Sequence, residues 1–265
     1  CLINLRKRGL GHWATERPFL ILFQKRNLII MHIHGSGFIA KNFKKIKLRK
    51  LKKVVIYAAG VSNSKSKNKK IFLKERKKIQ IFLNNHNTEH LFIYISTTSV
   101  LDNYLKKDKY TRNKIIIENL IKKSLNNFII LRLPQIVGKS NNPHTITNFI
   151  YKKILLGQKF KVWSNVKRNL IDIDDLIKIV KQIISTKLKP GNVINILNPN
   201  SIYVEEIVNI MGKIVKKKPR YILVKYKPKM KGNLNIQSSS KFNLDIAKYF
   251  KDKNYFKKIL KKYYR

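Results

Sequence analysis

Four short apolar runs, separated by segments long enough for a helix, constrain the fold of this chain more than any other feature. The runs lie at 28–33, 54–59, 91–96 and 128–133. An uninterrupted apolar run of this length is typical of a strand buried on both faces of a parallel sheet. The intervening segments predict helices over about 38–50, 71–84 and 110–124. This alternation predicts an α/β fold with right-handed crossovers.

The second half of the chain is less regular. Asp174 or Asp175 stands at the start of one predicted helix, where a carboxylate caps free backbone N–H groups. We expect helices over about 145–156, 174–185, 202–215 and 245–264, and short strands over 161–163, 192–196 and 221–224.

Composition limits the class of protein. Among the 265 residues, 59 Lys and Arg stand against 13 Asp and Glu, which gives a net charge of +46. Lys pairs occur in nearly every segment, so we favour a compositional bias with incidental polyanion affinity over dedicated nucleic-acid binding. The single cysteine, Cys1, excludes a disulfide framework and a thiolate zinc site. No apolar run reaches about 18 residues, so we expect no membrane-spanning helix.

A glycine-rich turn follows the first apolar run. Gly35, Gly37 and Ala40 fit the pattern G-x-G-x-x-G/A between a strand and a helix. The first glycine makes a tight turn, the second lets the backbone approach a pyrophosphate, and the alanine keeps helix and strand close. A glycine-rich connection without a ligand is the plainer interpretation of the same pattern.

Two further patterns could carry chemistry. Tyr110 and Lys114 are four residues apart, so they share one face of a helix. An ammonium beside a phenol lowers the phenol pKa, which suits Tyr110 to proton transfer. The hydroxyls of Ser96, Thr97, Thr98 and Ser99 lie at the end of a predicted strand, at the edge where open parallel sheets bind ligands, so one of them could hydrogen-bond a substrate oxygen. The plainer interpretation is that Tyr110 and Lys114 lie on the surface of a lysine-rich helix and that the hydroxyls belong to an ordinary turn, without a catalytic role.

Six segments in order resemble the extended short-chain dehydrogenase/reductase superfamily, specifically its NAD-dependent nucleotide-sugar epimerases and dehydratases. The resemblance covers about residues 28–215. Its segments are HGSGFIAKNF, VVIYAAGVS, FIYISTTSV, YTRNKIIIE, FIILRLPQIVG and RNLIDIDDL.

The resemblance implies a Rossmann-like parallel sheet with a small C-terminal substrate-binding lobe, and a mechanism. Tyr110 would be the acid/base, Lys114 would hold the nicotinamide ribose, and Thr97 would be the catalytic hydroxyl. Gln135 and Arg168 would contact the nucleotide sugar, Arg168 through its diphosphate. The cofactor-binding residues would be Gly35, Ser36, Gly37, Phe38, Ile39, Ala40, Ala58, Ala59, Lys114 and Pro134.

The sequence also departs from the family. Only about 21 residues separate Gly37 from Ala58, so the fold is expected to be shortened by the loss of strands after the first βα unit. No acidic residue follows the glycine turn at the ribose-binding distance, and the segment there is basic. Two interpretations follow. The basic run could bind a 2′-phosphate and so favour NADP over NAD. Alternatively, the adenosine pocket is impaired and the cofactor binds weakly or not at all. Thr98 and Ser99 stand where the dehydratases carry Asp and Glu, which disfavours elimination.

We therefore expect a cytoplasmic NAD(P)-dependent epimerase or ketoreductase acting on a nucleotide-activated sugar, with a homodimer as the implied assembly. The alternatives are a catalytically impaired scaffold that binds a nucleotide sugar or a protein partner and, less favoured, an RNA-associated relative. No metal site is expected. Residues 1–30 are expected to be a non-native or disordered extension before a start at Met31. Residues 31–140 would bind cofactor and residues 141–265 substrate, with 168–200 returning to the Rossmann core.

Overall fold

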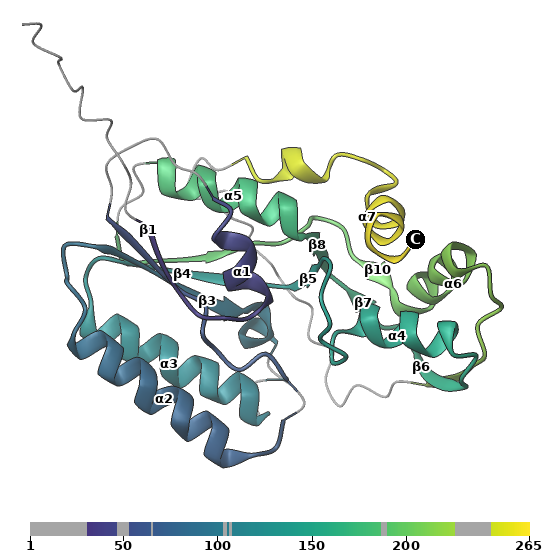
Figure 1. Cartoon of the computed structure of the whole chain (residues 1–265), viewed down its shortest axis with the longest axis horizontal. Coiled ribbons are helices and arrows are strands. Elements are labelled where there is room, and N and C mark those ends of the chain that lie inside the picture. The colour runs from purple at the N-terminus through teal and green to yellow at the C-terminus, as the bar shows by residue number, and fades with distance from the viewer. Residues whose placement is uncertain are drawn as a thin grey trace, which may run out of the picture.

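A computed structural model describes residues 31–46, 53–64, 66–102, 105, 108–186, 190–225 and 245–265. The expected extension at residues 1–30 lies outside these ranges. The described chain forms a parallel sheet covered by helices, and beside it a smaller lobe of helices and two-stranded ribbons (Figure 1). No helix within these ranges is long and apolar enough to cross a bilayer.

The main sheet has five strands in the order β1-β2-β3-β4-β9, and every neighbouring pair is parallel. Its strands are β1 (Met31–His34), β2 (Val54–Tyr57), β3 (Leu91–Thr97), β4 (Phe128–Leu133) and β9 (Asn192–Asn195). The expected shortening is confirmed, because β2 pairs directly with β1 after a single helix. Within the described residues, β1 is therefore the outer strand of the sheet.

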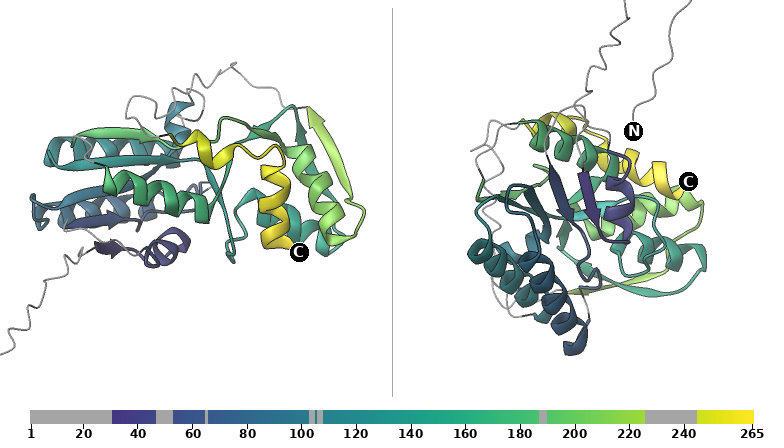
Figure 2. Two further views of the ribbon diagram at one scale, coloured as in Figure 1. Left: turned by 90° about the horizontal axis from the view of Figure 1, so that it is seen from above. Right: turned by 60° about the vertical axis from the view of Figure 1, so that its left-hand side comes forward.

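Helices cover both faces of the sheet. One face carries α2 (Lys69–Asn84) and α3 (Lys109–Ser124), and the other carries α1 (Phe38–Phe43) and α5 (Ile173–Ser185) (Figures 1 and 2). Alternate strand residues serve the two faces, as in β2, where Val55 and Tyr57 pack toward α2 and α3 while Val54 and Ile56 join the opposite core. Strands buried on both faces explain why the apolar runs show no polar alternation.

The smaller lobe lies beyond the carboxyl ends of the strands (Figure 2). It contains α4 (Ile146–Leu155), α6 (Val204–Val215) and the C-terminal α7 (Tyr255–Tyr264). Its short strands pair as β5 (Gln135–Val137) with β8 (Leu170–Asp172), β6 (Phe160–Ser164) with β11 (Tyr221–Lys225), and β7 (Lys167–Arg168) with β10 (Ile202–Tyr203).

Two predicted boundaries are wrong, and the tail expected to be mostly helical consists of two helical pieces. The helix expected from residue 202 begins at Val204, because Ile202 and Tyr203 pair with β7. The helix expected over 38–50 ends at Phe43, and residues 47–50 lie outside the described ranges. The tail expected over 245–264 divides into a 3₁₀ turn at Ala247–Phe250 and α7.

The cap of α5 also differs from the prediction. Asp172, rather than Asp174 or Asp175, is the N-cap, and its Oδ1 accepts a hydrogen bond from the Asp174 backbone N–H at 3.0 Å. Asp174 and Asp175 occupy the first turn, where carboxylates also favour the helix dipole.

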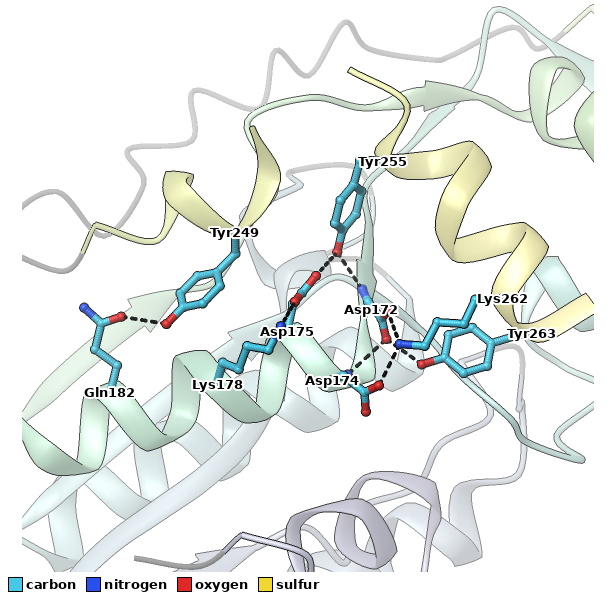
Figure 3. A network of polar contacts seen from close by, with 9 residues as sticks. All are labelled: Asp172, Asp174, Asp175, Lys178, Gln182, Tyr249, Tyr255, Lys262 and Tyr263. Atoms are coloured by element: carbon cyan, nitrogen blue, oxygen red, sulfur yellow. Dashed lines mark hydrogen bonds and ion pairs between the residues drawn. The ribbon is translucent and has the colours of Figure 1, made fainter. Parts of the chain in front are cut away.

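The C-terminal helix is docked onto the start of α5 by polar contacts (Figure 3). The Tyr263 hydroxyl donates to Asp172 at 2.6 Å, and the Lys262 ammonium lies 2.7 Å from the same carboxylate. The Tyr255 hydroxyl donates to Asp175 at 3.0 Å. These contacts join the last helix to an element of the main sheet layer, so they tie the smaller lobe to the sheet.

Candidate active site

The glycine turn sits at the carboxyl end of β1. Gly35 has a φ of +136°, and a Cβ there would lie 2.6 Å from the Ala58 carbonyl oxygen. Gly37 is the N-cap of α1, no side chain caps that helix, and a Cβ at Gly37 would meet nothing within 4 Å. The first glycine is thus required by the fold, whereas the second leaves open space before the backbone N–H groups of α1.

A single cleft of about 2320 Å³ runs along this edge of the sheet and the smaller lobe. It collects most of the predicted site residues from six separate segments of the chain. Those on its wall are Gly35, Ser36, Gly37, Phe38, Ile39, Ala58, Ala59, Thr97, Tyr110, Lys114, Pro134, Gln135 and Arg168. Ala40 is the exception, because it is fully buried where α1 packs into the core.

Thr97 and Ser96 point to different surroundings, as neighbours on a strand do. The Ser96 hydroxyl donates to the buried Glu118 at 2.6 Å, so it belongs to the interior. The Thr97 hydroxyl donates to Ser99 Oγ at 3.1 Å and accepts from the Ser99 backbone N–H at 3.2 Å. This small turn holds Thr97 at the cleft.

Tyr110 and Lys114 share the face of α3 that meets the cleft. Asp108 caps α3 by accepting from the Tyr110 backbone N–H at 3.0 Å, which fixes the first turn. The Lys114 ammonium lies 5.7 Å from the centre of the Tyr110 ring. The predicted pairing of a phenol with an ammonium is therefore present in space.

Lys114 is nevertheless buried and already paired. Its side chain is 3% exposed, and its ammonium lies 2.9 Å from Glu75 Oε1 and donates to the Tyr94 hydroxyl at 3.2 Å. Burial alone would lower the pKa of Lys114, but Tyr94, Tyr110 and Glu75 outweigh it and raise the pKa above its usual value. Burial raises the pKa of Tyr94, so its hydroxyl stays protonated.

Gln135 and Arg168 lie on the cleft wall that faces the smaller lobe. Gln135 begins β5, and its backbone N–H donates to the Asn169 carbonyl at 3.2 Å. Arg168 ends β7, and its guanidinium donates to the Lys167 carbonyl at 3.3 Å. Both side chains are partly exposed, so a ligand in the cleft can reach them.

Glu75 and Tyr94 are the site residues that the sequence prediction missed. Glu75 shares the inner face of α2 with Phe72, Ile79 and Leu83, and all four are buried. A carboxylate at the apolar spacing of a lysine-rich helix was the available signal, because a buried acid requires a buried cation. Tyr94 lay within an apolar run that read as core.

The residues present fit part of a dinucleotide cofactor. The open bend at Gly37, before the uncapped start of α1, is a cradle that a pyrophosphate can enter and that a Cβ would begin to fill. Ala58, Ala59 and Pro134 offer an apolar wall to a flat ring. The described residues offer fewer contacts to the adenosine end of the cofactor, since β1 is the outer strand of the described sheet and His34 is exposed.

Comparisons with known proteins agree with this architecture. Residues 50–196 match the NAD dependent epimerase/dehydratase family, a region that begins after the glycine turn. No curated protein matches the chain.

Solved structures match it in fold. RMD from Pseudomonas aeruginosa, complexed with NADPH, is 14% identical with a TM-score of 0.67, over 87% of this chain and 96% of that chain. UDP-glucuronic acid 4-epimerase from Bacillus cereus, in complex with NAD, is 20% identical with a TM-score of 0.61, over 86% and 74%. UDP-N-acetylglucosamine 4-epimerase from Bacillus cereus is 15% identical with a TM-score of 0.56, over 87% and 97%.

The family match spans more than half of the chain, and it includes strands β2, β3, β4 and β9 of the sheet together with Thr97, Tyr110 and Lys114 of the cleft. The chain belongs to the NAD-dependent epimerase/dehydratase family.

Proposed function

We propose that this protein is an NAD(P)-dependent epimerase or ketoreductase that acts on a nucleotide-activated sugar. The observation that carries the proposal is the convergence of Thr97, Tyr110 and Lys114 with the glycine turn on one cleft. The cleft volume of about 2320 Å³ exceeds the roughly 300–1,000 Å³ of a pocket for one small molecule. It therefore has room for a dinucleotide and a nucleotide sugar together.

In this proposal, Tyr110, Thr97 and Lys114 have different roles in a reaction at one sugar oxygen. Tyr110 exchanges a proton with that oxygen, and the Thr97 hydroxyl donates a hydrogen bond to it in place of the one that it gives to Ser99 Oγ. The Lys114 ammonium, near the Tyr110 ring, favours negative charge that develops on the phenol. A bound nicotinamide cofactor supplies the hydride chemistry. Gly35 to Ile39 hold its pyrophosphate, while Ala58, Ala59 and Pro134 pack on its ring.

The charge of the cleft supports a nucleoside diphosphate group in the substrate. Lys139, Lys161, Lys167 and Arg168 line the part of the cleft that lies against the smaller lobe. A guanidinium binds a diphosphate with two parallel hydrogen bonds, and the lysines add positive potential. Several of the similar structures contain UDP-glucuronic acid or UDP-glucose, which makes these the first substrates to test.

Calorimetric titration with NAD, NADH, NADP and NADPH tests the cofactor part of the proposal, and UDP-glucose and UDP-glucuronic acid test the substrate part. Micromolar binding of one dinucleotide supports an enzyme. A protein that binds none of the four at millimolar concentration is not an oxidoreductase. The same titrations decide between NAD and NADP.

A second candidate is a non-catalytic relative that keeps the fold as a scaffold. The shortened sheet favours it, since the loss of strands beside β1 weakens the expected contacts to the adenosine end of a cofactor. Binding of a nucleotide sugar with no dinucleotide binding would support the scaffold.

The division of labour between the two parts and the assembly are also proposals. We propose that residues 31–140 bind cofactor, that residues 141–265 bind substrate, and that 168–200 serve the sheet through α5 and β9. We propose a homodimer formed through α2 and α3, whose outer surfaces expose Leu73, Ile81 and Ile116 at 58%, 53% and 42%. Light scattering on the purified protein measures the assembly.

A further inference from the structure

The carboxylate of Glu75 is the nearest counter-charge to the lysine of the candidate site. It is 5% exposed, and its Oε1 atom lies 2.9 Å from the Lys114 ammonium. An unpaired ammonium at this depth would be costly, because burial removes its hydration. Glu75 therefore allows a charged lysine to occupy the interior beside the cleft.

The second carboxylate oxygen of Glu75, Oε2, also has a hydrogen-bond partner. Asn113 donates to Glu75 Oε2 at 2.8 Å, and the Arg76 Nε–H donates to Asn113 Oδ1 at 2.7 Å. Asn113 immediately precedes Lys114 on α3, whereas Glu75 and Arg76 lie on α2. The chain of contacts thus fixes the carboxylate between the two helices, and the ammonium with it.

The loop after β2 closes over this ion pair. A Cβ at Gly60 would collide with Lys114 Nζ and would lie 2.9 Å from Glu75 Oε1. Gly60 and Lys114 both line the cleft. Because Gly60 has no side chain, the Lys114 ammonium can lie against the backbone of this loop and still line the cleft.

An ammonium has three N–H donors, and Glu75 and Tyr94 receive two of them. We propose that Glu75 is a positioning residue that keeps Lys114 charged, beside the Tyr110 ring, with one donor directed to the cofactor. This inference rests on the proposed function, and it assigns to α2 a part in the site that the family resemblance does not mention.

The groups that face the ammonium decide its protonation. They are Glu75 from α2, Tyr94 from β3, Tyr110 from α3 and, at longer range, Tyr57 from β2. Only Glu75 carries a negative charge at neutral pH. Replacing it with glutamine leaves the shape of the site but removes the one negatively charged group among those that offset the burial of Lys114, so the lysine is expected to lose its proton more easily.

The test compares Glu75→Gln with Glu89→Gln, which changes an exposed carboxylate in the loop after α2. Urea midpoints are measured for the full chain between pH 7 and pH 10. A buried lysine whose pKa falls below its unfolded value makes the folded state bind fewer protons than the unfolded state, so stability rises with pH. Relative to the parent, the midpoint of Glu75→Gln should be lowest at pH 7 and recover toward pH 10.

The double variant Glu75→Gln/Lys114→Met should lose that pH-dependent difference, because the titrating group is gone. A Glu75→Gln midpoint that differs from the parent by the same amount at every pH, or that behaves like Glu89→Gln, overturns the proposal.

The functional readout is NADH and NADPH binding at pH 6.5 and pH 9. For Glu75→Gln, binding of the accepted dinucleotide should weaken by about tenfold between these pH values, a loss of one charge-assisted hydrogen bond, while the parent changes little. Equal binding by parent and variant at both pH values contradicts the inference. A parent that binds neither dinucleotide contradicts the proposed function instead, and the urea series still decides the role of Glu75.

Discussion

The Tyr264 hydroxyl lies 2.5 Å from Asn148 Oδ1, which connects the last turn of α7 to the cleft wall. The Asn148 amide in turn donates to the backbone carbonyls of Ser140 and Asn142, at 2.8 Å each. Ser140, Asn142 and Tyr264 all line the cleft. The C-terminal helix therefore holds in place a loop that lines the cleft.

Tyr264→Phe should loosen this loop without unfolding the protein. Losing one hydrogen bond costs about 1 kcal/mol, so the urea midpoint should fall only slightly. The KM for the nucleotide sugar should rise several-fold while kcat changes little, because the reacting groups are elsewhere. Tyr249→Phe, which removes a hydroxyl bonded to Gln182 on α5, is the matched control. An unchanged KM would show that the loop orders itself without Tyr264.

Tyr110→Phe tests the proton transfer. Removing a general acid or base typically costs about 10²–10⁴-fold in turnover. Binding of the dinucleotide, measured by titration, should remain within a few-fold of the parent because Lys114 and the glycine turn are untouched. Turnover close to that of the parent would assign the proton transfer to another group.

The two glycines of the turn should separate folding from cofactor binding. Gly35→Ala puts a Cβ against the Ala58 carbonyl in a left-handed conformation, so it should destabilise the protein by more than 1 kcal/mol in urea unfolding. Gly37→Ala has open space and extended backbone, so stability should change by less than about 0.5 kcal/mol. The Gly37 variant should nevertheless bind dinucleotide more weakly. Unchanged affinity would exclude a pyrophosphate at this bend.

The ion pair of the partly exposed Arg132 with the buried Glu118 should stabilise the fold only when both charges are present. Arg132 donates to both Glu118 oxygens, at 3.0 and 2.5 Å, beneath the strand ends. Arg132→Met leaves a buried carboxylate unpaired, which typically costs about 3–5 kcal/mol. Adding Glu118→Gln should restore part of that loss in a denaturant cycle. Additive losses in the double variant would show that the two side chains contribute independently.

The Tyr255 hydroxyl should make the docking of the last helix sensitive to alkaline pH. Burial raises the pKa of Tyr255 above its usual value, and the neighbouring Asp175 carboxylate adds to the effect. A folded-state pKa above the unfolded value gives stability that is complete below about pH 10 and is lost as the pH rises further. Melting temperatures between pH 8 and pH 11 should therefore fall more steeply for the parent than for Tyr255→Phe. Parallel curves would contradict this.

The sequence was sufficient for the centre of the sheet because β2, β3 and β4 are buried on both faces. Runs such as 54–59 and 128–133 have no polar alternation to misplace, and the shortened cofactor half followed from counting residues between Gly37 and Ala58. Element boundaries were less predictable. Ile202 and Tyr203 read as the start of a helix because their pairing with β7 is a tertiary contact that no local pattern encodes.

The candidate site was predictable residue by residue but not in its charge balance. The glycine turn, Thr97, Tyr110 and Lys114 follow from local patterns, and the cleft brings them together. The partner of Lys114 could not be assigned, since Glu75 lies 39 positions earlier and reaches it only through the packing of α2 on α3. Likewise, the acids at the start of α5 read as helix caps, although their partners come from the last 11 residues of the chain.

The position of β1 at the rim of the described sheet bears on how long a nucleotide would stay bound. Since none of the described residues forms a further strand beside it, the adenosine portion of a dinucleotide would gain little burial from this part of the chain, and most of its retention would come from the phosphates and the pyridine ring. A cofactor held in this way would leave after each reaction and be replaced from solution. Such turnover suits a one-way reduction, in which fresh reductant arrives every cycle, better than an isomerisation that must return the same hydride to its substrate.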